Sequence, residues 1–247
     1  AGLAIQLDQS SWGVELYTPS SDLSILIDDT YQGPLQLTAA RDIIIDTRLV
    51  VSDMDVIFNA ENIVFTDRGS IVNAYGQIIL AATKSIDLDG ADGRTVLEAD
   101  YISLDADSII QNGAIIAADT LTIISQSGTS LNTSVRSLIA DIQGAGDLQI
   151  NARSSIELTD IQIANGSLIV EAIGTIVSRE VFLMTDWYAN QVRLSATENL
   201  SLDKLGVGKF VGVTLRSQAQ IANINNDLTI VSSVNPAEIN EGDSTSF

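Results

Sequence analysis

The stretch IILAATKSIDL, residues 78–88, carries the pattern that decides the fold. Ile78 and Leu80 are large and apolar at a spacing of two residues, and the small residue Ala82 follows after two more. This spacing places the three side chains on one face of a β-strand. Ile86 and Leu88 repeat it after a short polar segment, so we predict two strands joined at a corner, where only a small side chain such as that of Ala82 fits.

The same order of large, large and small residues recurs nine times between residues 35 and 217. The small residues of these repeats are Ala39, Ala60, Ala82, Ala99, Ser125, Ala152, Ala172, Ala196 and Ser217. Their mean spacing of about 22 residues is typical of a solenoid, a propeller or a repeat array. The two large steps, from Ala99 to Ser125 and from Ser125 to Ala152, require insertions, and the small polar residues 126–134 predict a loop.

The repeat favours an all-β fold, a parallel β-helix (β-solenoid) of about nine to ten coils. Leucine-rich repeats would show a fixed Asn or Cys and a returning helix, and propellers would show aromatic signatures, all of which are missing. We assign residues 34–232 to the β-helix and residues 233–247 to a linker toward a following module. Residues 1–33 form either an N-terminal cap or preceding coils.

The composition excludes several classes of function. The 32 acidic and 12 basic residues give a net charge of −20, which argues against a nucleic-acid partner. Cys and His are both absent, so disulfides, thiol catalysis and the common Ser-His and Cys-His nucleophiles are excluded. The sequence contains no run of about 18 apolar residues that would predict a membrane span.

Four repeats, LQLTAARDIIID, IILAATKSIDLD, LQINARSSIELT and VRLSATENLSLD, resemble those of filamentous haemagglutinin-type adhesins. The resemblance extends roughly from Leu35 to Ser232 and implies a parallel β-helix within a giant bacterial surface protein. The Asn-Pro-Asn secretion signature of that family is missing. The tail PAEINEGDSTSF resembles the first strand of an Ig-like module, which implies that the native sequence continues past Phe247.

The densest acidic cluster lies in IDLDGADGR and contains Asp87, Asp89 and Asp92 beside two glycines. Carboxylate oxygens on a glycine-containing turn suit calcium, although the spacing is not that of an EF-hand. Asp and Gly are also common in ordinary turns, which is the alternative interpretation.

The segment FLMTDWY contains the aromatic residues Phe182, Trp187 and Tyr188 between two repeats. Such residues stack on sugar rings or anchor a protein partner, and an insertion that covers the core would use the same residues.

One group of residues departs from the expected alternation. Outward positions should be polar, yet we find apolar residues there and predict a shielded outer stripe. The stripe consists of Ile44, Ile57, Val64, Ile79 and Val96. The cover would be residues 1–33 or a second chain.

These observations predict a non-enzymatic structural or adhesive segment of a large secreted or cell-surface bacterial protein, located outside the cell. Its partners would be other modules of the same polypeptide and a protein or glycan on a surface. We expect no cofactor, with calcium as the one candidate ion. The alternatives are a carbohydrate-active β-helix (a polysaccharide lyase or glycoside hydrolase) and an envelope component whose copies calcium would bridge.

Overall fold

The computed structural model describes residues 3–5, 14–25, 29–52, 54–90, 93–184, 190–208 and 211–223. The chain is an all-β parallel β-solenoid of about nine turns, which confirms the predicted fold class. The described residues contain no helix that could cross a membrane. The chain divides into two compact units, Ala1–Ser125 (unit 1) and Gln126–Phe247 (unit 2).

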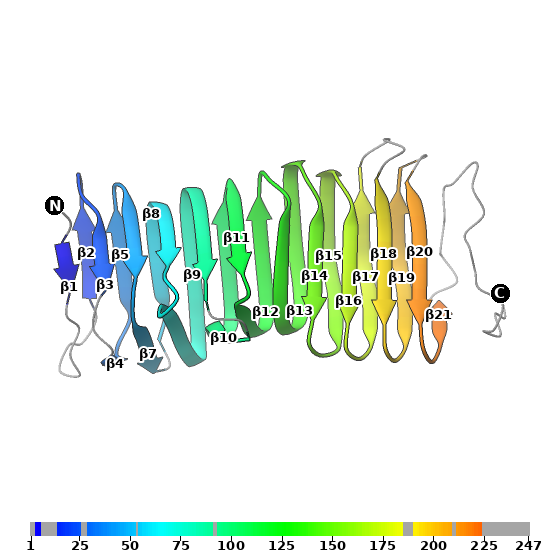
Figure 1. Ribbon diagram of the computed structural model, residues 1–247, viewed down its shortest axis with the longest axis horizontal. Coiled ribbons are helices and arrows are strands. Elements are labelled where there is room, and N and C mark those ends of the chain that lie inside the picture. Colours follow the sequence, from blue (N-terminus) through cyan, green and yellow to red (C-terminus); the bar gives the residue numbers. More distant parts are fainter. Residues whose placement is uncertain are drawn as a thin grey trace. The chain divides into compact units, whose positions relative to one another are not determined.

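Unit 1 consists of three columns of parallel strands, because each full coil contributes one strand to every column (Figure 1). The first column contains β2 (Val14–Thr18), β5 (Leu35–Ala39), the start of β8 (Val56–Phe65), the middle of β9 (Ser70–Asp89), and the second halves of β10 (Thr95–Ala106) and β12 (Ile115–Ser125). The second contains β1 (Leu3–Ile5), β3 (Leu23–Ile25), β6 (Asp42–Ile45), the ends of β8 and β9, and β11 (Ser108–Asn112). The third contains β4 (Asp29–Gln32), β7 (Arg48–Ser52) and the starts of β9, β10 and β12.

Unit 2 also has three columns. The first contains the start of β13 (Thr129–Ala145), β14 (Leu148–Ala152), β16 (Leu168–Ala172), β18 (Gln191–Ala196) and β20 (Gly212–Ser217). The second contains the middle of β13, the starts of β15 (Ile156–Asn165), β17 (Ile176–Leu183) and β19 (Leu200–Val207), and β21 (Ile221–Asn223). The third contains the ends of β13, β15, β17 and β19.

The core of each unit is formed by equivalent apolar residues that stack from coil to coil. In unit 1, Leu35 pairs with Val56 and Val56 with Ile78, and all three side chains are fully buried. Burial of such a side chain is worth about 1.5 to 3 kcal/mol. Because a single coil cannot cover its own apolar face, the stability of each unit comes from stacking.

The small-residue column is confirmed within each unit, with one correction. The repeat that ends at Ala99 does not belong to the first column. In that column Ile102 pairs with Ile78 on one side and with Leu121 on the other, so the repeat there ends at Ala106. The small residues of unit 1 are therefore Ala39, Ala60, Ala82, Ala106 and Ser125. This alignment replaces the uneven steps of 17 and 26 residues by steps of 24 and 19, so the insertion between Ala99 and Ser125 is no longer required.

A break in register explains the misassignment. The pairing of β10 shifts between Thr95 and Leu97, and both Val96 and Leu97 are buried, with 1% and 0% of their surfaces exposed. Such a bulge directs two successive side chains toward the core and interrupts the alternation. Val96 is therefore a core residue, and its assignment to the outer stripe is wrong.

Two segments that the repeat alignment left out form regular strands. Within residues 1–33, β2 pairs with β5 and β3 with β6, so the described part of this segment forms a preceding coil. Within residues 126–134, a strand begins at Thr129 and pairs with β14, where the sequence predicted a loop. Residues 233–247 lie outside the described part of the chain.

Candidate functional site: a groove in unit 2

A groove of about 480 Å³ runs over the small-residue column of unit 2. Its lining includes Ala152, Ala172 and Ala196, which occupy the same corner in three successive coils. Each alanine is at least 95% buried, and its side chain occupies an inward position of the strand. The repeat motif that allows the coil to turn thus also forms the floor of the groove.

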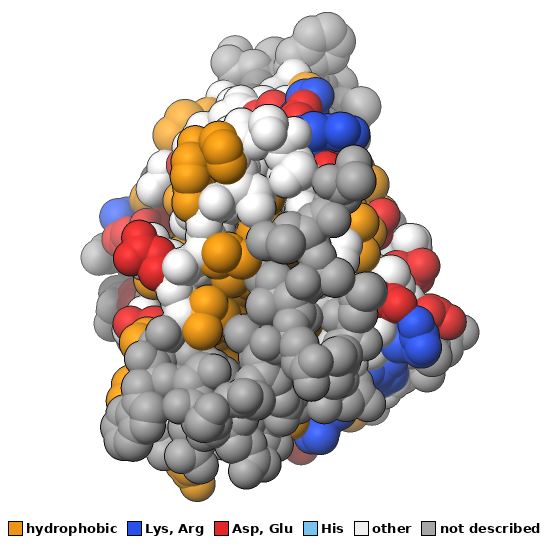
Figure 2. Space-filling model, turned by 90° about the vertical axis from the view of Figure 1, so that its left-hand side faces the viewer, with side chains coloured by type: hydrophobic (Ala, Val, Ile, Leu, Met, Phe, Trp, Pro, Cys, Tyr) orange, Lys and Arg blue, Asp and Glu red, His pale blue; other side chains and the backbone are white. Residues whose placement is uncertain are grey.

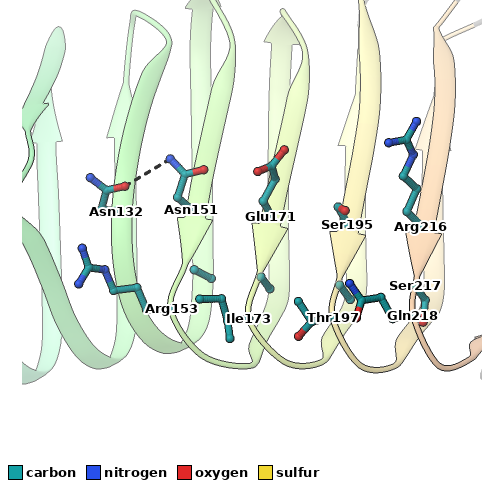
Figure 3. A pocket seen from close by; sticks show the side chains of 13 residues that line it. Asn132, Asn151, Arg153, Glu171, Ile173, Ser195, Thr197, Arg216, Ser217 and Gln218 are labelled. Atoms are coloured by element: carbon teal, nitrogen blue, oxygen red, sulfur yellow. Dashed lines mark hydrogen bonds between the residues drawn. The ribbon is translucent and has the colours of Figure 1, made fainter. Parts of the chain in front are cut away.

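Two rows of side chains form the walls (Figure 3). One row projects outward from the strands of the first column, and consists of Asn132, Asn151, Glu171, Ser195 and Arg216. The other follows the corner residues, and consists of Arg153, Ile173, Thr197 and Gln218. Each of the five coils contributes one residue to the first row, and four of them contribute one to the second, so the lining repeats with the coil spacing of about 4.8 Å.

The charges of the groove are unevenly paired. A nitrogen of the Arg193 guanidinium, on the neighbouring outward row, lies 3.2 Å from a carboxylate oxygen of Glu171. Arg153 and Arg216 are both exposed, and neither forms an ion pair with a residue that the structure describes. The negative charge of the groove is therefore matched internally, whereas no described residue neutralises Arg153 or Arg216.

The other lining groups are amides, hydroxyls and one aliphatic side chain. The Asn151 amide donates a hydrogen bond of 3.3 Å to the side-chain oxygen of Asn132 on the preceding coil. The Thr197 hydroxyl accepts a hydrogen bond of 2.8 Å from the Gly174 amide, which fixes one wall. Ile173 is 66% exposed between these polar groups. The groove thus offers hydrogen-bonding groups and an apolar surface side by side.

The predicted calcium residues are only partly described. Asp87 points outward from β9 and is half-buried, Asp89 is exposed, and Asp92 lies outside the described residues. Burial raises the pKa of the Asp87 carboxyl, and the charge of Asp89 raises it further. One carboxylate oxygen of Asp89 accepts a hydrogen bond of 2.9 Å from the Gly90 amide, as in an ordinary turn. No group of three or more carboxylates that could hold a metal occurs among the described residues.

Of the predicted aromatic contact residues, only Phe182 is described; Trp187 and Tyr188 lie outside the described residues. Phe182 projects outward from β17, and its ring centroid lies 4.9 Å from the ammonium nitrogen of Lys204. A Cβ atom on Gly206 would lie 2.5 Å from the same ring. The Phe182 ring therefore lies against the next coil, and a role in partner binding stays a prediction.

The outward apolar residues do not form one stripe. Ile57 pairs with Ile79 in the first column, and Ile44 pairs with Val64 in the second. All four are half-buried because the coils above and below flank them. In the view of Figure 2, hydrophobic side chains form several small groups with uncharged atoms between them, and charged side chains lie toward the edges of the view.

The proposed cover is also corrected for the described part of residues 1–33. Strands β2 and β3 lie within the stack of coils and not across the outward residues. The half-burial of these apolar residues therefore has a local cause, the stacking of β-branched side chains, and requires no lid.

Sequence reasoning missed the groove. The corner alanines were correctly identified in unit 2, but they were interpreted only as a packing requirement. A signal was present in the residue that follows each alanine, because this position is Arg153, Ile173 and Thr197 in successive repeats. Only the register between coils shows that these residues form one wall.

In comparisons with known proteins, no family model, curated protein or solved structure matches the chain significantly. The fold and the register define its class, a parallel β-solenoid protein. The resemblance to haemagglutinin-type adhesins stays a prediction from the repeats.

Proposed function

We propose that this chain is a non-enzymatic structural or adhesive segment of a large secreted or cell-surface bacterial protein. In this role each unit is a stiff stack of coils that presents side chains in fixed rows. The other modules of the polypeptide are its covalent partners, and a glycan or protein on a surface is its binding partner.

The observation that carries the proposal is the unbroken register of the first column of unit 2. Leu148 pairs with Leu168, Leu168 with Val192 and Val192 with Val213, so one register extends over four coils. Parallel pairing of this kind satisfies backbone hydrogen bonds between coils and resists bending of the stack. Rigid rows suit display and spacing better than they suit a closing active site.

The groove chemistry favours binding over hydrolysis. Glycoside hydrolysis normally uses two carboxylates about 5 to 10 Å apart. Among the described residues that line the groove, Glu171 is the one carboxylate, and Arg193 holds it in an ion pair. The absence of His and Cys from the sequence removes the commonest alternative general base and nucleophiles.

The test of this proposal is an assay for cleavage and adhesion with the same protein preparation. The chain is incubated with a panel of neutral and acidic polysaccharides, and new reducing ends and unsaturated products are measured. We expect neither product to form, while beads coated with the chain adhere to at least one immobilised polysaccharide. Turnover of any polysaccharide would overturn the non-enzymatic assignment.

The location is tested separately on cells of the source organism. An antibody raised against the chain should label intact cells or the culture medium, and treatment of intact cells with protease should remove the cell-bound signal. Labelling that requires lysis of the cells would contradict an extracellular or surface location.

A further inference from the structure

We propose that the groove of unit 2 binds a linear acidic polysaccharide, a chain of β-1,4-linked uronic acids, along the stacking direction of the coils. This inference rests on the adhesive role proposed above and specifies the ligand class of that role. It assigns a binding function to side chains that the repeat pattern does not require.

The length and the period of the groove suit such a chain. The lining comes from five successive coils of unit 2, from Asn132 to Arg216, and therefore extends over about 19 Å. A β-1,4-linked pyranose chain advances by close to one coil spacing per sugar. Neighbouring sugars of such a chain are turned by half a revolution relative to each other, so every coil meets one sugar and every second coil meets the same face of a sugar.

The period argues against an extended peptide as the ligand. Side chains on one face of an extended peptide repeat about every 6.7 Å, which does not match the coil spacing of about 4.8 Å. A peptide would therefore lose register with the groove within a few residues, whereas a sugar chain, whose advance per sugar is close to the coil spacing, loses register more slowly.

The positions of the two arginines indicate acidic sugars. Arg153 and Arg216 lie three coils apart, at about 14 Å along the axis, and neither is neutralised by a described residue. Guanidinium groups bind carboxylates through two parallel hydrogen bonds. Carboxylates three sugars apart point to opposite sides of such a chain, and Arg153 and Arg216 stand in opposite rows of the groove, so both arginines can be paired at once.

The groups between the arginines suit the uncharged parts of a sugar. The amides of Asn132, Asn151 and Gln218 donate and accept hydrogen bonds, as sugar hydroxyl groups require. The exposed side chain of Ile173 offers an apolar surface to the C–H groups of a pyranose ring. The ion pair between Glu171 and Arg193 reduces the repulsion that Glu171 would otherwise exert on an acidic ligand.

The experiment uses a β-1,4-mannuronate hexasaccharide as the probe and β-1,4-mannohexaose, its uncharged counterpart, as the reference. Binding of each to the full chain is measured by calorimetry. We expect the charged probe to bind at least ten-fold more tightly than the uncharged one, and the difference to shrink as the salt concentration rises.

Two sets of variants locate the site. Arg153→Gln combined with Arg216→Gln should weaken binding of the charged probe at least ten-fold and weaken binding of the uncharged probe much less. The matched control, Arg179→Gln combined with Lys204→Gln, removes the same charge from residues outside the groove and should change binding less than two-fold. Ser195→Trp keeps both arginines and should reduce binding of both probes by filling the groove.

The outcomes separate this inference from the proposed function. Equal binding of the two probes, or equal effects of the two arginine pairs, would overturn the inference. The inference would also fail if the charged probe did not bind at millimolar concentration. In each of these cases the non-enzymatic adhesive role would stand, provided that the polysaccharide panel shows adhesion without turnover. Cleavage of the bound hexasaccharide would instead contradict the proposed function while preserving the ligand class.

Discussion

Units 1 and 2 use the same corner motif but surround it with different side chains. In unit 1 the residue after Ala60 is Glu61, which forms an ion pair with Lys84 on the next coil. In unit 2 the residue after Ala152 is Arg153, which forms no ion pair with a described residue, and the residue after Ala172 is the exposed, apolar Ile173. The comparison teaches that the motif determines the packing of the corner. The residues beside the corner determine whether its charges pair with neighbouring coils or are left to bind a ligand.

The charge of the two units follows the same division. Unit 1 contains 19 acidic and 5 basic residues, and unit 2 contains 13 and 7. The acidic excess therefore lies mainly in unit 1. An acidic ligand would be repelled less by unit 2, which is consistent with the position of the groove.

Unit 1 also tolerates a polar residue in its core. Asn73 is fully buried on β9 and donates hydrogen bonds of 2.6 Å and 3.1 Å to the carbonyl oxygens of Met54 and Gln77. These bonds hold the irregular backbone where the third column turns into the first. The core of unit 1 thus contains local exceptions, and sequence alignment by periodicity failed within the same unit.

The largest expected effect tests the irregular register of unit 1. Val96→Asp should destabilise the protein by about 3 to 5 kcal/mol, because it leaves an unpaired charge in the core. Ile79→Asp, at a half-buried outward position of the same unit, is the matched control and should cost much less. Urea unfolding measures both. Equal costs would mean that Val96 faces outward, as the sequence pattern predicted.

The next effect tests whether the small corner residues are equally tightly packed in both units. Ala82→Leu in unit 1 and Ala152→Leu in unit 2 should each cost about 1 to 3 kcal/mol by overpacking a corner. Gln149→Leu, on the outward face of β14, provides the control and should change the melting temperature little. If only one of the two alanine variants were destabilised, the corners of the two units would not be packed in the same way.

A smaller effect concerns the pH dependence of unit 1. The folded-state pKa of Asp87 is raised, mainly by burial, so its ionised form destabilises the fold. The destabilisation of the fold is absent at a pH below the unfolded-state pKa of about 3.9, and it is complete at a pH above the raised pKa of the folded state. Asp87→Asn should therefore raise the melting temperature at pH 7 and have little effect at pH 3.

The pKa of Asp46 is shifted in the opposite direction from that of Asp87. Its pKa is lowered by a hydrogen bond from Thr66 and then by Arg68, so its contribution is stabilising above the unfolded pKa and is lost as the pH falls through the lowered value. Asp46→Asn should accordingly lower the melting temperature at pH 7. A shift of the same sign in both variants would contradict the assigned environments.

The smallest expected effect compares ion pairs between coils. The pair of Arg179 and Glu157 in unit 2 has a distance of 2.8 Å, and the pair of Arg41 and Asp22 in unit 1 has one of 3.5 Å. Both are largely exposed, so a double-mutant cycle should give a coupling energy of about 0.5 kcal/mol or less for each. A coupling above about 1 kcal/mol in only one unit would show that ion pairs stabilise the two stacks differently.

The sequence predicted the fold class because a two-residue alternation with a small residue at each corner is a local requirement of a narrow coil. It also identified most corner residues, since Ala60 and Ala172 can be recognised from their immediate neighbours. It failed at Val96 because a bulge changes which side chain faces the core without changing the residue types. The function of the aromatic residues could not be judged from composition, as the contact of Phe182 with Lys204 joins two coils.

What the sequence by itself determined is the repeat, the class of fold and the chemistry that the missing His and Cys exclude. Only the tertiary structure decided which repeats lie above one another, that residues 14–25 form a coil, and that Arg153 and Arg216 line the same groove. The physical reason is the range of the interactions. Alternation and corner size act within a few residues, whereas register depends on pairing between residues that are about one repeat apart, and small insertions or bulges shift it.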